Sequence, residues 1–354
     1  IAQKLIDFAK ILVGRIPGGL AHTNILGNTL FGSLSGSSVA ASVAIGGVLI
    51  PMEEKEGYDK KFAAAVNIAS APTGLIIPPS GILIIYPVLA GCSVVGMIMS
   101  GYIPGLMWAL ACMVVAYVIA KKNHYPTAGK VPASVFFKYF VDAIPSLLLI
   151  VIIVGGVMSG IFTATESAAV AVAYTLFLSI VVYRSIKIKD LPKILLDACE
   201  TTAVIMFLIA GSNVMSFVMS FTGLPSAIGN ALISVSSNKY VILLIINLVL
   251  LVVGCFMDIT PAVLIFTPIF LPVVQSFGMD PIHFGIMMVM NLGIGNITPP
   301  VGSALFSGCS VADMDMEDMI KPILPFYAAI FVALMLVAYV PWFSMALPTL
   351  FGAV

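Results

Sequence analysis

Long apolar stretches along this chain are interrupted by short groups of glycine, proline and serine. Residues 1–19 carry charged side chains at helical spacing and end at Pro17-Gly18-Gly19, which predicts an amphipathic arm helix. Residues 20–52 are largely apolar and are broken in the middle by Ser33, Ser35, Gly36, Ser37 and Ser38. The two apolar arms are each about 14 residues long, shorter than the ~20 residues that a helix needs to cross a bilayer. This pattern predicts a re-entrant helical hairpin over 20–52.

A broken apolar segment follows the hairpin. Residues 62–90 are divided by Pro72-Thr73-Gly74 and by Pro78-Pro79-Ser80-Gly81, which predicts a discontinuous helix. Residues 94–120 contain no such interruption and predict one continuous helix. We expect scaffold and connecting helices over 121–223. Their apolar stretches are 139–162, 165–183 and 194–222.

The same order of elements then occurs again. Sliding the sequence by 221 residues aligns Gly74 with Gly295 and Pro78-Pro79 with Pro299-Pro300. If 20–120 is one copy, 224–354 is the second. Its parts are an arm at 224–238, a hairpin at 240–274 broken at 257–261, a discontinuous helix at 282–311 broken at 293–300, and a final helix at 322–347. Paired interruptions of apolar segments in two halves indicate a transporter binding site.

Composition determines the class of protein. Of 354 residues, 60% are hydrophobic and 9% are charged, and the mean hydropathy is +1.14. A water-soluble fold cannot bury that much apolar surface, so we predict an all-α integral membrane protein. The five cysteines lack metal or disulfide spacing, so we expect small buried side chains. No basic patch is interleaved with aromatic residues, so we expect no nucleic-acid partner.

Charge placement predicts how the copies are oriented. We expect five full crossings between the two hairpins, an odd number, so the copies face opposite sides and form an inverted repeat. If the lysines of 121–138 are cytoplasmic, these crossings put every other basic residue except Lys239 on that side, in agreement with the positive-inside rule. The start at Ile1 lacks a methionine and has no signal-peptide pattern, so we expect a fragment of a longer chain.

The breaks carry the candidate chemistry. Irregular backbone at membrane depth needs partners from protein or water, and proline cannot donate to the carbonyl four residues before it. The carbonyls that we expect to be freed are those of Gly74, Leu75, Gly295 and Asn296. Side-chain oxygens accompany them, from Ser35, Ser37, Ser38, Thr73, Asp258, Thr260, Asn296 and Thr298. Oxygen ligands without histidine or cysteine suit an alkali cation better than zinc or copper.

Other residues near the breaks either favour the binding of an anion or have two possible roles, one functional and one structural. Thr260-Pro261 and Thr298-Pro299 have the order of an N-cap hydroxyl followed by a first helical proline, so we expect half-helices to begin there and attract a carboxylate. Asp258 is ionisable at membrane depth, where a charge costs about 2.5–3.5 kcal/mol and indicates function. Ser37-Ser38 could instead be small packing residues. Glu166 could simply be the first-turn acid of a helix.

With these motifs, the chain resembles the large membrane subunit of the tripartite ATP-independent periplasmic (TRAP) transporters, over essentially its whole length. The resemblance rests on Leu34-Ser35-Gly36-Ser37-Ser38-Val39-Ala40, Ile77-Pro78-Pro79-Ser80, 162–170 around Thr165-Glu166, Cys255-Phe256-Met257-Asp258, and Ile297-Thr298-Pro299-Pro300-Val301-Gly302. It implies a sodium-coupled secondary importer of small organic acids, not an enzyme, with an elevator-type fold in the bacterial inner membrane. It also implies a small membrane subunit and a periplasmic substrate-binding protein as partners.

The resemblance also implies two sodium sites and the residues that form them. The first is carried onto Ser35, Ser37, Ser38, Thr73, Gly74 and Pro79, and the second onto Asp258, Thr260, Gly295, Thr298 and Pro300. We expect substrate contacts from Ser35, Ser80, Asn296 and Ser303. Asn296 stands where we expect an apolar residue, which can alter the second site. Family members usually begin with further membrane segments before the arm helix.

Three other functions remain as alternatives. A sodium-coupled divalent-anion symporter has similar inverted hairpins but uses no binding protein. An intramembrane serine hydrolase could use Ser35, provided that one of the histidines, His22, His124 or His283, is its base. A channel is less compatible, because channel re-entrant segments mostly form symmetric oligomeric filters. The sequence does not identify the acid, since sialic acid and C4-dicarboxylates are both compatible substrates.

Overall fold

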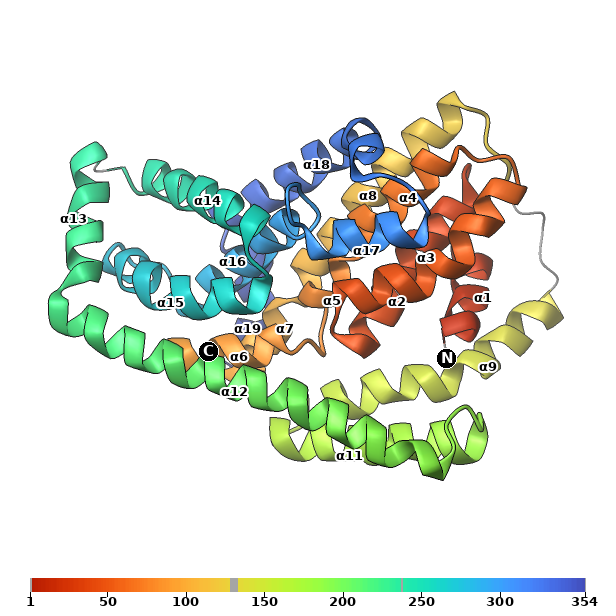
Figure 1. Cartoon of the computed structure of the whole chain (residues 1–354), viewed down its shortest axis with the longest axis horizontal. Helices are drawn as coiled ribbons and strands as arrows, with labels where there is room; N and C mark the ends of the chain where they lie inside the picture. Colours follow the sequence, from red (N-terminus) through yellow and green to blue (C-terminus); the bar gives the residue numbers. More distant parts are fainter. Residues whose placement is uncertain (1, 128–132, 237, 354) are drawn as a thin grey trace.

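A computed structural model of the chain describes residues 2–127, 133–236 and 238–353. All regular structure within these ranges is helical (Figure 1). The first helices are α1 (Ala2–Val13), α2 (Gly19–Ser35), α3 (Ser38–Lys55), α4 (Lys60–Ser70), α5 (Thr73–Ile76), α6 (Ile82–Ala90), α7 (Val94–Ser100) and α8 (Tyr102–Lys122). The middle helices are α9 (Ala133–Ile150), α10 (Gly156–Met158), α11 (Ala164–Phe177) and α12 (Leu191–Thr222). The last are α13 (Leu224–Val235), α14 (Lys239–Phe256), α15 (Ile259–Ser276), α16 (Pro281–Gly295), α17 (Ser303–Val311), α18 (Met316–Tyr339) and α19 (Trp342–Leu350).

The first hairpin is formed by α2 and α3. The chain reverses within two residues, because Gly36 takes a left-handed conformation with φ of 63° and Ser37 caps α3 by accepting a hydrogen bond from the amide of Ala40. The remaining serines of the tip lie inside the helices. The arms therefore contain 17 and 18 residues and are longer than expected.

The predicted range 62–90 contains α4, α5 and α6, which are separated at both proline groups. Asp59 begins α4 by accepting a hydrogen bond from the amide of Phe62. The predicted uninterrupted helix over 94–120 corresponds to one membrane-spanning stretch, Val94–Lys122, although a single turn residue, Gly101, divides it into α7 and α8. The carbonyl oxygen of Ile76 in α5 comes within 2.2 Å of where a Cβ of Gly101 would lie, so only glycine fits this close approach.

The middle helices form a separate layer. In Figure 1, α9, α11 and α12 run along the lower edge of the molecule, beneath the two hairpins. The layer contacts the rest of the chain through α9 on α1 and α2 and through α12 on α13 and α15. Short π-helical turns at Val151–Gly155 and Leu178–Val182 and a 3-10 turn at Ile188–Asp190 connect its parts. Lys130, one of the basic residues used for the orientation, lies outside the described residues.

The helix pattern of the first copy recurs in the second. The hairpin helices α3 and α15 both have 18 residues and begin 221 residues apart. The helices α4 and α16 differ in length but also begin 221 residues apart. Two boundaries differ from the prediction. The second hairpin breaks only at Met257-Asp258, since α15 begins at Ile259, and the final helix is divided at Val340-Pro341 into α18 and α19.

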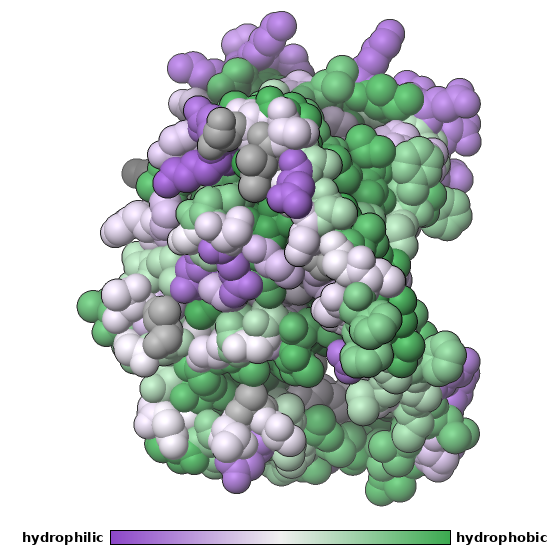
Figure 2. Space-filling view, turned by 90° about the vertical axis from the view of Figure 1, so that its left-hand side faces the viewer, coloured by the Kyte–Doolittle hydropathy of each residue, from purple (hydrophilic) through white to green (hydrophobic). Residues whose placement is uncertain are grey.

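The discontinuous helices occupy the centre of the fold. Every residue from Phe62 to Ser70 in α4 and from Ile282 to Gly295 in α16 is buried. The outside is apolar: Figure 2 shows broad hydrophobic areas on one face, with hydrophilic side chains gathered mainly along its upper edge. Seven helical stretches of the described chain are long and apolar enough to cross a membrane. The molecule is therefore a multi-pass membrane protein.

The cysteines differ in exposure. All five are free thiols. Cys112 and Cys309 are buried as expected, whereas Cys92 and Cys255 are half-buried and Cys199 is exposed on α12. The expectation of five buried side chains is therefore wrong for Cys199, because α12 has few packing partners.

Candidate cation and substrate site

Each hairpin contacts a helix break through a pair of glycines. A Cβ built on Gly32 in α2 would lie 2.4 Å from the Cα of Gly74 in α5. In the second copy, a Cβ built on Gly295 would lie 2.4 Å from the carbonyl carbon of Gly254 in α14. Contacts this short leave no room for a side chain, so the backbone of each hairpin arm lies directly on the backbone of a break.

The tip of the first hairpin also contacts the second part of the first break. A Cβ on Gly36 would lie 3.3 Å from the carbonyl oxygen of Pro79 and 3.4 Å from the Cα of Ser80. The hydroxyl of Ser80 is buried and has no hydrogen-bond partner among the protein atoms. A buried hydroxyl without a partner is uncommon, and it points to a water, ion or substrate oxygen at this tip.

The first-copy oxygens have defined local partners. Ser37 accepts from the amide of Ala40 at 3.2 Å, and Ser35 is exposed, with its hydroxyl 3.4 Å from the carbonyl of Ser37. The hydroxyl of Thr73 is buried and donates to the carbonyl of Ser70 at 2.7 Å. A hydroxyl that donates in this way keeps its lone pairs free to accept or to coordinate a cation.

A hydrogen-bonded chain joins the two copies. Asn296 is buried just after α16, and its Nδ2 donates to the hydroxyl of Ser38 at 2.7 Å. The Oδ1 of Asn296 accepts from the hydroxyl of Ser303, which also lies 3.1 Å from Oδ1 of Asp258. The tip of the first hairpin, the second break and the tip of the second hairpin are therefore connected through Ser38, Asn296, Ser303 and Asp258.

The backbone carbonyls of the second break, which were expected to be free, accept hydrogen bonds. The carbonyl of Gly295 accepts from the amide of Thr298 at 2.9 Å, and the carbonyl of Asn296 accepts from the amide of Ala304 at 3.1 Å. These two carbonyls are therefore not free, because a turn just before Pro299 and the start of α17 after Pro300 supply new donors. The amide of Val301 also donates to the carbonyl of Cys255 at 3.1 Å, which ties the break to the end of α14.

The two expected half-helix starts are also wrong. Asp258 rather than Thr260 is the N-cap residue of α15, so Thr260-Pro261 lies in the first turn of the helix. Thr298-Pro299 lies in the turn between α16 and α17, where the hydroxyl of Thr298 donates to the carbonyl of Ile294 at 2.6 Å. Both breaks contain a cis prolyl bond, at Pro78-Pro79 and at Pro299-Pro300.

Asp258 and Glu166 have different surroundings. The Asp258 carboxylate is exposed at the tip of the second hairpin and contacts Ser303, so it is accessible to a cation. Glu166 accepts from the amide and the hydroxyl of Thr163, which completes a capping box at the start of α11. The structure therefore supports the interpretation of Glu166 as the first-turn acid of a helix.

Two aromatic residues that the sequence analysis did not predict donate hydrogen bonds to backbone carbonyls at the breaks. Trp108 in α8 donates from its indole nitrogen to the carbonyl of Ala69 at 2.8 Å, next to the first break. Tyr327 in α18 donates from its hydroxyl to the carbonyl of Ile297 in the second break. A polar aromatic group within an apolar helix was the available signal, since such groups usually find a partner when buried.

The three histidines lie away from Ser35. His22 is on the same helix, 13 residues before Ser35, a separation of about 20 Å. His124 follows α8, and the Nε2 of His283 lies 2.8 Å from the carbonyl of Val337. None of the three is therefore next to the serine that a hydrolase would use.

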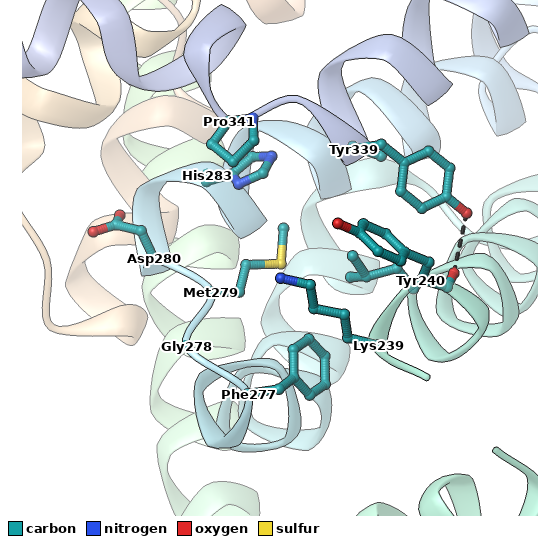
Figure 3. A pocket seen from close by; sticks show the side chains of 11 residues that line it. Lys239, Tyr240, Phe277, Gly278, Met279, Asp280, His283, Tyr339 and Pro341 are labelled. Atoms are coloured by element: carbon teal, nitrogen blue, oxygen red, sulfur yellow. Dashed lines mark hydrogen bonds between the residues drawn. The ribbon is translucent and has the colours of Figure 1, made fainter. Parts of the chain in front are cut away.

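A separate pocket of about 230 Å³ opens at the far end of α16 (Figure 3). Lys239, Tyr240, His283 and Tyr339 are on its wall, and the carboxylate of Asp280 points away from its centre. The 15 residues of α16 separate this pocket from Asn296, a distance of about 22 Å. The pocket is therefore not part of the hydrogen-bonded chain between the hairpin tips.

Comparison with known proteins identifies the family. Residues 1–343 match the model of the family described as "Tripartite ATP-independent periplasmic transporter, DctM component". An uncharacterized protein of Salmonella typhimurium, YgiK, is 51% identical over 99% of this chain and 81% of its own length. The C4-dicarboxylate TRAP transporter large permease DctM of Pseudomonas aeruginosa and the sialic acid TRAP transporter large permease SiaM of Vibrio cholerae are each 38% identical over 99% of this chain and 82% of their own length. The chain therefore belongs to the DctM family of TRAP transporter large permeases.

Proposed function

We propose that this permease imports a small organic acid together with sodium ions. The observation that carries the proposal is the meeting of both hairpin tips and the second helix break, joined through Ser38, Asn296, Ser303 and Asp258, while the first break lies against the first tip at Gly36. Converging broken segments from two halves of a chain are typical of ion and substrate sites in secondary transporters.

The first sodium site would lie between the first hairpin tip and the first break. Gly74 and Pro79 are already against the hairpin, and Thr73 keeps lone pairs available. The second site would lie between Asp258 and the second break, with Thr260, Gly295, Thr298 and Pro300 around it. Both sets consist of oxygen donors, which suit sodium.

The organic acid would bind between these sites. Ser80 offers a buried hydroxyl without a partner, while Asn296 and Ser303 offer polar groups that could exchange their mutual hydrogen bond for bonds to a ligand. Ser35 would contribute from the exposed side of the tip. Relatives are named for C4-dicarboxylates and for sialic acid. We infer the class of small carboxylates, with the particular acid selected by a periplasmic binding protein.

The motion would be an elevator movement of the hairpins within an inverted repeat. The arms α1 and α13 pack on the layer formed by α9 and α12, so they are suited to connect a fixed scaffold with a moving core. A small membrane subunit would complete that scaffold in the bacterial inner membrane. Large apolar side chains on α12, such as Phe207, Phe217 and Phe221, are exposed and would face this subunit or lipid.

Charge movement gives the sign of the coupling. Moving one elementary charge through 100 mV is worth about 2.3 kcal/mol, so an inside-negative potential opposes entry of a monoanion by that amount. Two sodium ions with one monoanion carry one net positive charge inward, and the potential then drives uptake.

Reconstitution with the cognate binding protein and small subunit tests the proposal. We expect uptake of an acid from a panel of carboxylates to require sodium and to carry net positive charge inward. Transport that continues when potassium replaces sodium would refute it, and uptake without the binding protein would favour the divalent-anion symporter. Asp258→Ala should raise the sodium concentration needed for half-maximal uptake, whereas Asp197→Ala, on the exposed face of α12, should not.

A further inference from the structure

One carboxyl group is completely buried away from the proposed ion sites. Glu53 lies in the last turn of α3 and has 0% of its surface exposed, although it is flanked by the exposed residues Glu54 and Glu56. It lies at the end of the first hairpin that the charge pattern assigns to the cytoplasmic side. Acidic side chains are almost never fully buried unless they are paired.

Glu53 has no cationic partner in the part of the chain that the structure describes. Among the described residues, the nearby lysines pair elsewhere: Lys10 with Glu56, and Lys60 with Glu54, each at 3.8 Å. Within the described ranges, the single hydrogen bond to the carboxyl group of Glu53 is a long one, 3.5 Å from Nδ2 of Asn24 to Oε1. The second oxygen, Oε2, has no partner.

The ionisable groups around this position are few. Of the helices that pack on α3, α1 carries Lys4, Asp7 and Lys10, α2 carries His22, α4 carries Lys60 and Lys61, and α17 carries Cys309, while Glu54, Lys55, Glu56 and Tyr58 lie beside Glu53 in the chain. Lys61 pairs with Asp318 at 2.6 Å. Glu56 and Tyr58 can only add negative charge near Glu53, which disfavours its ionised form.

A line of buried polar side chains leads from Glu53 to the first break. The Oδ1 of Asn24 accepts from Nδ2 of Asn28 at 3.0 Å. The same Nδ2 lies 3.0 Å from Oδ1 of Asn67 and 2.9 Å from the hydroxyl of Ser70. Since Thr73 donates to the carbonyl of Ser70, the line runs from the carboxyl group to the break.

The second copy has apolar side chains at four of these positions, whereas the position of Ser70 holds Asn291, which donates to Oδ1 of Asn247. Leu250 and Ile246 stand four and eight residues before Gly254, as Asn28 and Asn24 stand before Gly32. Val274 stands in α15 where Glu53 stands in α3, and Met288 stands seven residues before Gly295 as Asn67 stands before Gly74. All four second-copy residues are buried at 0% exposure. The hairpin architecture therefore does not itself require the polar line.

Burial and pairing decide the charge state of Glu53. An isolated carboxylate in a dry interior costs far more than a neutral carboxyl group, and an ionisable side chain in that position neutralises instead. We propose that Glu53 is a proton-binding site of the first hairpin, occupied by a proton in the packed arrangement. The proton would leave when the end of α3 separates from Asn24 and water reaches Oε2. Proton binding would thus favour the closed hairpin, and alkaline pH would favour its opening.

Infrared spectroscopy of the purified permease in detergent tests the charge state directly. At neutral pH, the wild-type protein should show the carbonyl band of a protonated carboxylic acid. Glu53→Gln should lack this band, and the control Glu54→Gln should keep it. A wild-type spectrum in which Glu53→Gln removes only a carboxylate band would overturn the proposal. If the glutamine variant does not assemble, Glu53→Val, which copies Val274, permits the same comparison.

Thermal unfolding gives a second, thermodynamic measure of the protonation of Glu53. If the folded state holds a proton that the unfolded state releases, the folded-to-unfolded ratio of the wild type should fall tenfold per pH unit relative to Glu53→Gln across the neutral range. Equal pH slopes of wild type and Glu53→Gln would contradict the proposal. Neither sodium nor substrate enters these measurements, so their outcome is independent of the uptake experiment.

Discussion

The glycine contact between the first hairpin and the first break allows a quantitative test. In Gly32→Ala, the new Cβ would lie 2.4 Å from the Cα of Gly74 and 2.8 Å from its amide nitrogen. Non-bonded carbon atoms prefer about 3.5–4.0 Å, so α2 and α5 must separate by more than about 1 Å. Both neighbouring atoms belong to the backbone, so no side-chain rotation can relieve the clash.

Overpacking of this kind typically costs about 1–3 kcal/mol. If the closed contact is needed to hold sodium at the first break, this cost reduces the apparent affinity for sodium by about 5- to 150-fold. The replacement of glycine by alanine also stabilises the helix α2 itself by up to ~1 kcal/mol, which offsets part of the loss in melting temperature but does not relieve the clash at the contact.

The assay is uptake into proteoliposomes as a function of sodium concentration, with the melting temperature in detergent measured in parallel. Gly211→Ala is the matched control, since this helical glycine has nothing within 4 Å of a built Cβ and reports the helix gain alone. Wild-type half-saturation by sodium together with a wild-type melting temperature in Gly32→Ala would refute the reasoning. Gly295→Ala, whose Cβ would lie 2.4 Å from the carbonyl carbon of Gly254, should behave in the same way.

Three further predictions concern other parts of the molecule. Asn296→Ala removes the bond between the copies and leaves the Ser38 hydroxyl without its donor, so we expect a loss of about 1–3 kcal/mol of stability and weaker uptake, measured by melting and transport. Burial raises the pKa of Tyr58 to about 12, so its protonated form contributes stability that is lost as pH rises from about 10 to 12; Tyr58→Phe should flatten the alkaline melting curve over that window. Thr163→Ala removes the N-cap that Glu166 completes, and we expect a loss of about 1 kcal/mol in melting experiments with unchanged sodium half-saturation.

Glycine and proline made the breaks predictable from the sequence, because their effect on a helix is local. The reversal at Gly36 and the interruptions at Pro72 and at Pro78-Pro79 are examples. Helix lengths were less predictable. A serine next to a tip can remain helical, as Ser35 does, so the hairpin arms are longer than the apolar stretches.

Partners of polar groups were the least predictable part of the site. The carbonyls of Gly295 and Asn296 find amide donors in turns that the Thr-Pro spacing does not reveal. The pairing of Asn296 with Ser38 joins residues 258 positions apart, and no local pattern specifies it. For the same reason, the sequence does not reveal that Glu53, the first residue of a charged stretch, is a core residue through tertiary packing.

The hydroxyl of Ser303 has a single hydrogen but two acceptors, Oδ1 of Asp258 and Oδ1 of Asn296. A cation bound at Asp258 would occupy one of those acceptors and leave the hydrogen to the amide. The amide, in turn, holds Ser38 on the opposite hairpin. Competition for one proton donor therefore offers a route by which filling a site in one half of the molecule is felt at the tip of the other.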